Sequence, residues 1–157
     1  MTRARRGFSY VELLTVLAVI GVLVRIAIPT FTDMQRRAIA AEIITDVHTI
    51  RLASYTYYTE KSSWPPDYAS GVVPTELVHY LPQNFAFTRP NFEYDYELWP
   101  LSAGTPSNPQ QETILGLSVT TSDPLLAQEV LKIAGRGYVP FALGNKVTFF
   151  LSGVTGY

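Results

Sequence analysis

The stretch RRGFSYVELLTVLAVIGVLVRIAIP, residues 5–29, decides how the rest of this chain is arranged. A short basic leader ends at Gly7, and an apolar run of 21 residues follows, from Phe8 to Ile28. As a helix this run measures roughly 32 Å, enough to cross a hydrocarbon core of about 30 Å. The three arginines before it, at positions 3, 5 and 6, favour a cytoplasmic N-terminus. We therefore predict a membrane-spanning helix with the C-terminal part of the chain outside.

Glu12 is the one acidic residue inside the apolar run. A carboxylate at this depth costs about 2.5–3.5 kcal/mol, so it needs a partner or a polar cavity. Arg25 lies about 20 Å further along the helix, too far for a contact. Cleavage after Gly7 would leave a charged amine on Phe8, and the amine of a neighbouring copy could pair with Glu12. A carboxylate paired in this way would serve to assemble the subunits. The alternative is that Glu12 extends to the cytoplasmic interface and has no role.

The segment GFSYVELLTVLAVIGVLVRIAIP resembles the N-terminal signature of the type IV pilin and pseudopilin superfamily. The resemblance implies that a prepilin peptidase removes the leader after Gly7 and that the new N-terminal Phe8 is N-methylated. It further implies that Glu12 guides assembly into a filament. Gly21 and Pro29 stand where the family usually places a glycine and a helix-loosening proline.

Arg25 departs from this resemblance, because the family usually has a small apolar residue there. Its side chain could extend to lipid headgroups, but in a filament it needs an acid or water. A different alternative for the whole stretch is an ordinary secretory signal peptide. Its apolar run is long for that purpose, and Ala27-Ile28-Pro29 is a poor cleavage pattern.

Composition indicates one modest domain in addition to the anchor. The chain has 157 residues, 47% of them hydrophobic and 13% aromatic, which favours a packed core over disorder. There is no cysteine, so the domain must be held together by packing and hydrogen bonds. The net charge is −1 overall and −4 once the three leader arginines are removed. Nucleic acid is therefore not expected as a partner.

After Pro29 the sequence keeps a helical period, with apolar residues recurring at Ile39, Ile43, Val47, Ile50 and Tyr57. We predict one long helix over residues 9–58, loosened near Pro29 because proline removes an internal hydrogen bond. Its second half is amphipathic and must bury one stripe, for which the C-terminal residues are the expected cover.

Downstream patterns predict a small antiparallel sheet with one inserted helix. Strict alternation predicts strands, and Asp123 followed by Pro124 is a typical helix start. A proline at position 74 and another at 82 favour a short helix between them, while Ser, Pro, Gly and Asn residues over 100–111 favour a loop. The predicted strands are 92–98, 112–121 and 146–151, and the predicted helices are 74–81 and 125–133.

The sequence contains no pattern that predicts catalysis. His48 and His79 have no acids placed to complete a zinc site. The acids at positions 93, 95 and 97 share one strand face at roughly 7 Å spacing, too loose for a single ion, so a solvated face is a better account than calcium. We expect no enzyme activity, no catalytic residue, no metal ligand and no cofactor.

These observations lead to an α+β, pilin-like fold, in which a long N-terminal helix packs on an antiparallel sheet of about three to four strands. The expected divisions are a cleaved leader over 1–7, a transmembrane and assembly helix over 8–29, the amphipathic half of the helix over 30–60 and a globular domain over 61–157.

The function we predict is that of a structural subunit which polymerises into a type IV pilus-like filament after leader cleavage. One alternative is a pseudopilin of a type II secretion system, and another is a single-pass membrane protein with an outer binding domain that never polymerises. The resemblance implies a prepilin peptidase that is also an N-methyltransferase, other pilin-like subunits or copies of itself, inner-membrane lipid and an assembly platform as partners. It places the chain in a bacterial inner membrane with a periplasmic domain, and then in a pilus or pseudopilus.

Overall fold

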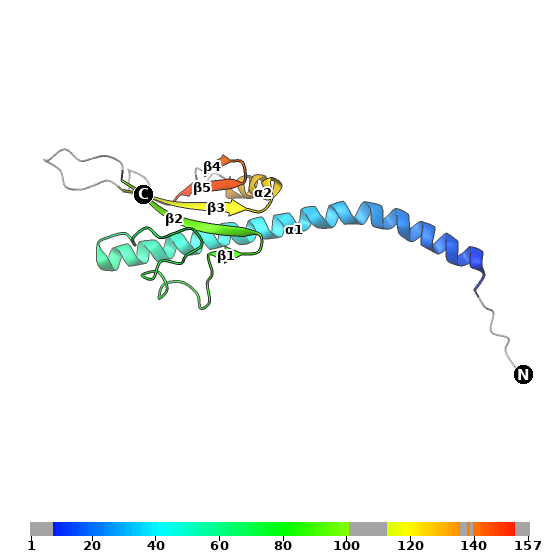
Figure 1. Cartoon of the computed structure of the whole chain (residues 1–157), viewed down its shortest axis with the longest axis horizontal. Coiled ribbons are helices and arrows are strands. Elements are labelled where there is room, and N and C mark those ends of the chain that lie inside the picture. The colour runs from blue at the N-terminus through cyan, green and yellow to red at the C-terminus, as the bar shows by residue number, and fades with distance from the viewer. Residues whose placement is uncertain (1–7, 101–112, 136–137, 139, 153–157) are drawn as a thin grey trace, which may run out of the picture. The chain divides into compact units, whose positions relative to one another are not determined.

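The computed structural model of this chain describes residues 8–100, 113–135, 138 and 140–152. Helix α1, Tyr10–Lys61, is followed by strands β1, Thr88–Arg89, β2, Phe92–Pro100, and β3, Thr113–Thr121. Helix α2, Pro124–Ala134, then precedes strands β4, Pro140–Leu143, and β5, Lys146–Phe150 (Figure 1). The chain divides into two units, Met1–Gln35 and Arg36–Tyr157, so that α1 contributes to both.

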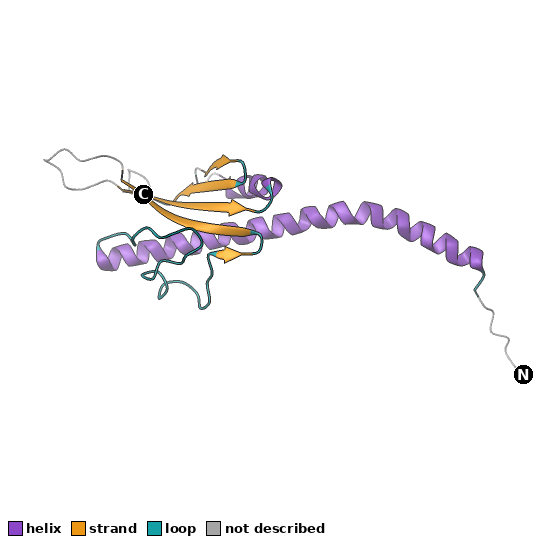
Figure 2. Cartoon of the chain, viewed as in Figure 1, coloured by secondary structure: helices purple, strands orange, loops and turns teal. Residues whose placement is uncertain are grey.

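The five strands found among the described residues form one fully antiparallel sheet in the order β1-β2-β3-β5-β4. β2 and β3 pair along nine residues, from Phe92 with Thr121 to Pro100 with Thr113. The last of the described strands, β5, inserts between β3 and β4, and α2 forms the connection that leads from β3 to this edge (Figure 2). The α+β fold class predicted from the sequence is confirmed.

The core of the second unit lies between α1 and one face of the sheet. Four residues of α1 at steps of three and four have no exposed surface: Ala40, Ile43, Val47 and Ile50. The alternate residues of the strands face them, because successive side chains of a strand point to opposite faces. These inward residues are fully or almost fully buried and comprise Tyr94, Tyr96, Leu115, Leu117, Val119, Val147 and Phe149.

Helix α2 forms as the sequence predicts. The Asp123 side chain accepts a hydrogen bond from the Leu125 backbone N–H at 2.9 Å, Pro124 occupies the first turn, and Gly135 ends the helix with a φ of 59°. Glycine adopts that positive φ without the penalty a side chain would bring.

Two predictions about elements are wrong in detail. Residues 74–81 form turns instead of a helix, since the bonds that close them are mostly three-residue steps, from Leu77 to Pro74 and from Tyr80 to Leu77. The described part of the sheet has five strands rather than three to four. The prediction missed β1, with two residues, and β4, with four, because they are too short for an alternation to be recognised. The predicted loop over 100–111 lies almost entirely outside the described residues.

Candidate functional site

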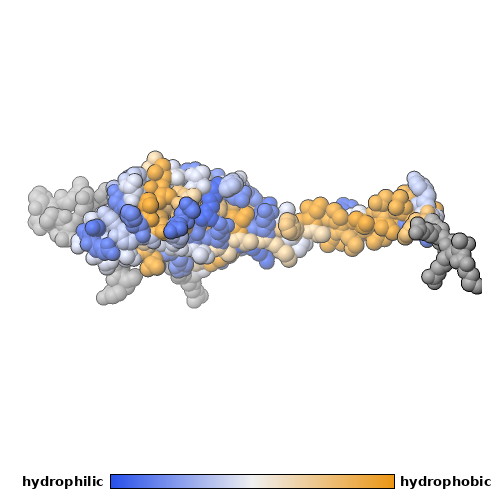
Figure 3. Space-filling view, turned by 90° about the horizontal axis from the view of Figure 1, so that it is seen from below, coloured by the Kyte–Doolittle hydropathy of each residue, from blue (hydrophilic) through white to orange (hydrophobic). Residues whose placement is uncertain are grey.

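The candidate assembly segment is the part of α1 from Tyr10 to Pro29, together with Phe8 and Ser9 before it. Every described residue from 8 to 35 is exposed, and most of the apolar side chains of this stretch expose half of their surface or more. Figure 3 shows the apolar side chains covering the visible face of this stretch. By length and composition α1 is the one helix among the described residues that could cross a membrane. Such a surface requires lipid or other protein as its cover.

Two threonine hydroxyls, one within this segment and one just after it, bond to carbonyls of their own helix. The Thr15 hydroxyl donates to the Val11 carbonyl at 2.9 Å, and the Thr30 hydroxyl donates to the Ile26 carbonyl at 3.2 Å. Hydroxyls bonded in this way add little cost in an apolar environment, because their donors are already used.

Glu12 lies in the first turn of α1, where its Oε2 accepts a hydrogen bond from the Ser9 backbone N–H at 2.7 Å. This is half of a capping box, in which a Glu at the third helical position bonds back to the residue before the helix. The helix dipole also favours a negative charge at this end. Our sequence reasoning missed this contact, although the Ser9-x-x-Glu12 pattern that predicts it is present. The second carboxylate oxygen is available to another donor.

The structure shows few contacts for the side chains of the other predicted site residues. Phe8 is 85% exposed just before α1 begins, and Gly7 lies outside the described residues. α1 continues through Pro29 without a break in its helical assignment, and the predicted loosening there stays a prediction. A side chain added at Gly21 would meet nothing within 4 Å. Arg25 makes no hydrogen bond or ion pair with any residue that the structure describes.

Several charged residues of α1 within the second unit have partners on other elements. Arg89 of β1 forms ion pairs with Glu42 and, at 3.0 Å, with Asp46, which also accepts a hydrogen bond from the Tyr94 hydroxyl at 2.9 Å. Burial raises the pKa of Asp46, and the Tyr94 hydrogen bond and the Arg89 charge oppose that rise. Burial next to the Asp46 carboxylate also raises the pKa of Tyr94 far above its ordinary value. Arg36 forms an ion pair with Asp123 at 2.8 Å.

The row of acids on β2 is partly neutralised within the sheet. Lys146 of β5 binds Glu97 at 2.9 Å and Asp95 at 3.5 Å, and the Ser70 hydroxyl donates to Glu93. Burial raises the pKa of Asp95, whereas the Lys146 hydrogen bond helps to hold the pKa of Glu97 below its ordinary value against the effect of burial. No group of three potential metal ligands lies together among the described residues.

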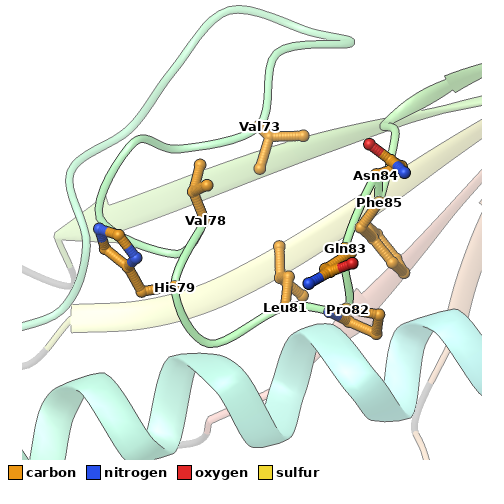
Figure 4. Close-up of a pocket in the computed structure, with 8 residues that line it drawn as sticks. All are labelled: Val73, Val78, His79, Leu81, Pro82, Gln83, Asn84 and Phe85. Atoms are coloured by element: carbon orange, nitrogen blue, oxygen red, sulfur yellow. The ribbon is translucent and has the colours of Figure 1, made fainter.

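A pocket of about 590 Å³ lies within the turn segment between α1 and β1. Figure 4 shows its lining side chains, of which only His79 can ionise. No acid or hydroxyl side chain lines it, so it has no pair of groups suited to acid–base or nucleophilic catalysis. The lining residues are Val73, Val78, His79, Leu81, Pro82, Gln83, Asn84 and Phe85.

Comparison with known proteins finds relatives among the pilins. The chain is 27% identical to the fimbrial protein EcpC of Eikenella corrodens over 94% of its own length and 96% of the relative. It is 33% identical to the type IV major pilin protein PilE of Neisseria gonorrhoeae over 46% of the chain and 44% of the relative. It is 36% identical to the type IV major pilin protein PilA of Myxococcus xanthus over 43% of the chain and 30% of the relative. No family model and no solved structure matches.

Proposed function

We propose that this chain, which is similar to type IV pilins and a fimbrial protein, is a structural subunit which polymerises into a pilus-like filament after residues 1–7 are removed. The observation that carries the proposal is the apolar stretch of α1 whose residues are all exposed from Phe8 to Gln35. Before assembly, membrane lipid would cover this surface. In a filament, the same stretch of neighbouring subunits would replace the lipid.

Removal of the leader would change the charge at the start of α1. A new amine at Phe8 would lie about 6 Å from Glu12 along the helix axis, while Glu12 Oε2 already accepts the Ser9 N–H. The amine of a neighbouring subunit could then bind the remaining carboxylate oxygen. A buried carboxylate whose charge only another molecule can balance would penalise every misaligned neighbour, so Glu12 would set the axial register.

The proposal includes processing and location. A prepilin peptidase would cleave between Gly7 and Phe8 and methylate the new amine, and an assembly platform would extract the subunit from the inner membrane. The domain from Arg36 onward would then lie on the periplasmic side. Pseudopilins of secretion systems share this plan, but the relatives found are named as pilins and fimbrial proteins, which favours a pilus.

Mass spectrometry of the N-terminal peptide tests the proposal directly. In cells that carry a prepilin peptidase, we expect the mature chain to begin at N-methylated Phe8 and to be recovered in the filament fraction sheared from the cell surface. The variant Gly7→Val should keep the leader and yield no filaments, whereas Arg6→Lys, which preserves the charge, should be processed normally. A mature chain that begins before Phe8 and stays in the membrane fraction would instead favour the non-polymerising, single-pass alternative.

A further inference from the structure

Glu12 and Arg25 are the two charged residues of the apolar run from Phe8 to Ile28. Glu12 receives one backbone hydrogen bond from Ser9, and Arg25 has no partner within the described part of the chain. An unpaired guanidinium surrounded by lipid tails or by other apolar helices is unfavourable, so residues of this kind normally have a partner or mark a functional site. Since no described residue of its own chain pairs with Arg25, we look for its partner on a neighbouring subunit.

The two charges cannot meet on one helix. They are 13 residues apart, which corresponds to about 20 Å along the axis and to about 140° around it. They therefore lie on nearly opposite faces, each accessible to a different neighbour.

This placement fits a repeating assembly and not a closed dimer. In a symmetric antiparallel pair, Glu12 of each helix would bind Arg25 of the other, which requires both residues to lie on the same face of their helix. In a parallel pair without an axial shift, Glu12 would lie beside Glu12 and Arg25 beside Arg25. Complementary groups on opposite faces instead allow each subunit to bind one neighbour through Glu12 and another through Arg25, which generates an open, head-to-tail array.

We propose that Arg25 of one subunit binds Glu12 of a second copy of this chain, with the two helices parallel and shifted by 13 residues. The proposal rests on the proposed function, because it requires the helices to pack side by side. It assigns to Arg25 the role of a positioning residue, whose charge selects one axial offset.

The residues one turn earlier support the same offset. A shift of 13 residues brings Phe8 to the level of Gly21, and both lie on the same faces as Glu12 and Arg25. Phe8 is 85% exposed, and a side chain at Gly21 would meet nothing within 4 Å. The exposed ring of Phe8 would thus lie over Gly21, the one glycine of the segment, while the charges pair one turn further on.

Pairing with Arg25 is compatible with pairing to the Phe8 amine. The amine contact needs an offset of about four residues, or 6 Å, whereas the Arg25 contact needs about 20 Å, so they involve two different neighbours. A carboxylate has two oxygens with about four acceptor positions and can serve both donors in addition to Ser9.

Asp33 is the competing acid. A shift of eight residues would place Arg25 at the level of Asp33 of a neighbour, about 12 Å along the axis. Asp33 lies beyond Pro29 and outside the apolar run, and it already makes an interaction. Glu12 lies inside the apolar run, where the benefit of pairing is larger, so it is the acid we assign.

Disulfide cross-linking tests the offset, because the natural chain contains no cysteine. The variant Thr15→Cys/Ile28→Cys carries thiols at two positions 13 residues apart, each three residues beyond one of the paired charges. Oxidation of sheared filaments should give a ladder of covalent multimers on a non-reducing gel. The matched variant Val22→Cys/Thr30→Cys reports the eight-residue offset and should give at least tenfold less multimer.

The dependence on charge is tested in the same Thr15→Cys/Ile28→Cys background. Adding Arg25→Ala should lower the cross-linked fraction at least tenfold, while Arg25→Lys, which keeps the charge, should retain most of it. Asp33→Asn should leave the ladder unchanged. Arg25→Ala makes the segment more apolar, so impaired membrane insertion would not account for its loss.

The outcomes separate the inference from the proposed function. If filaments form but the ladder survives Arg25→Ala, disappears with Arg25→Lys, or forms only with the Val22→Cys/Thr30→Cys pair, the pairing of Arg25 with Glu12 is refuted and the pilus subunit stands. If the unmodified chain forms no filament in cells that process its leader, the proposed function itself is refuted.

Discussion

The two halves of α1 satisfy their charges in opposite ways. From Arg36 onward, several charged residues of the helix find partners elsewhere in the same chain, such as Asp46 with Arg89 and Arg36 with Asp123. Before it, all residues from 8 to 35 are exposed, and Arg25 has no partner among the described residues. One half is therefore stabilised by the fold itself, whereas the other depends on what surrounds it. Folding and assembly should accordingly respond to different substitutions.

The largest effect on folding is expected from the core beneath α1. Phe149→Ala removes a ring with no exposed surface and should lower the free energy of unfolding by about 3–5 kcal/mol. Phe150→Ala is the matched control, since the next ring lies on the opposite face, is 41% exposed and should cost less than about 1 kcal/mol. Guanidinium unfolding of the full chain in mild detergent, followed by tryptophan fluorescence, measures both. Equal losses would show that the sheet does not bury the face described above.

A smaller effect is expected from the ion pairs that join α1 to β1. Asp46→Ala leaves Arg89 and the Tyr94 hydroxyl without this acceptor and should lower the free energy of unfolding by about 2–3 kcal/mol. Breaking a fully buried pair costs about 3–5 kcal/mol, and the loss here is smaller because the Arg89 side chain is 27% exposed. Glu42→Ala removes the other acidic partner of Arg89. Because the Glu42 side chain is 47% exposed, this change should lower the free energy of unfolding by less than about 1 kcal/mol. The same unfolding assay checks the order, and a larger loss for Glu42→Ala would contradict it.

The pH dependence of stability should show the burial of Asp46. Its pKa in the folded state is raised above the ordinary value of 3.8, so the folded state holds this proton more tightly than the unfolded one. Stability contributed by Asp46 should then decrease as the pH rises from about 3.8 through the raised pKa. Asp46→Asn cannot titrate, and the difference between the two unfolding curves across this range should isolate the effect. If the stability of the natural chain relative to Asp46→Asn instead increased with pH over this range, the Arg89 charge would outweigh burial in setting the pKa of Asp46.

The smallest effect is expected at the start of α2. Asp123→Ala removes both the cap on the Leu125 N–H and the ion pair with Arg36. Asp123→Asn keeps an equally good cap and loses only the charge. We expect the alanine variant to unfold at slightly lower denaturant concentration than the asparagine variant, and the asparagine variant to lie close to the natural chain. An asparagine variant as unstable as the alanine one would assign the effect to Arg36.

Local patterns made part of this structure predictable. The nine-residue β2 was recognised from its strict alternation, and the start of α2 was predicted because Asp123 and Pro124 fit the first positions of a helix. β1 and β4 were missed because two and four residues hold no readable period. The turns over 74–81 were mistaken for a helix since Pro74 and Pro82 delimit turns as well as helices.

Contacts between distant residues were beyond the reach of sequence patterns. Arg89 and Glu42 are 47 positions apart, and nothing near either residue indicates the other. The capping contact of Glu12 differs, because Ser9 and Glu12 are three positions apart and their spacing is itself the signal. Sequence reasoning located Glu12 as the candidate site residue but missed the contact that orients it.

The substitution Glu12→Gln tests the central claim most directly, namely that the charge of Glu12 serves assembly and not folding. Glutamine at this position can still accept the Ser9 N–H and preserve the start of α1, so only the charge is lost. Filament yield and the unfolding midpoint are measured together, with Glu42→Gln as the same change in the other half of the helix. We predict that Glu12→Gln lowers filament yield at least tenfold with an unchanged midpoint, whereas Glu42→Gln still assembles. Filaments from Glu12→Gln at the natural yield would contradict the account.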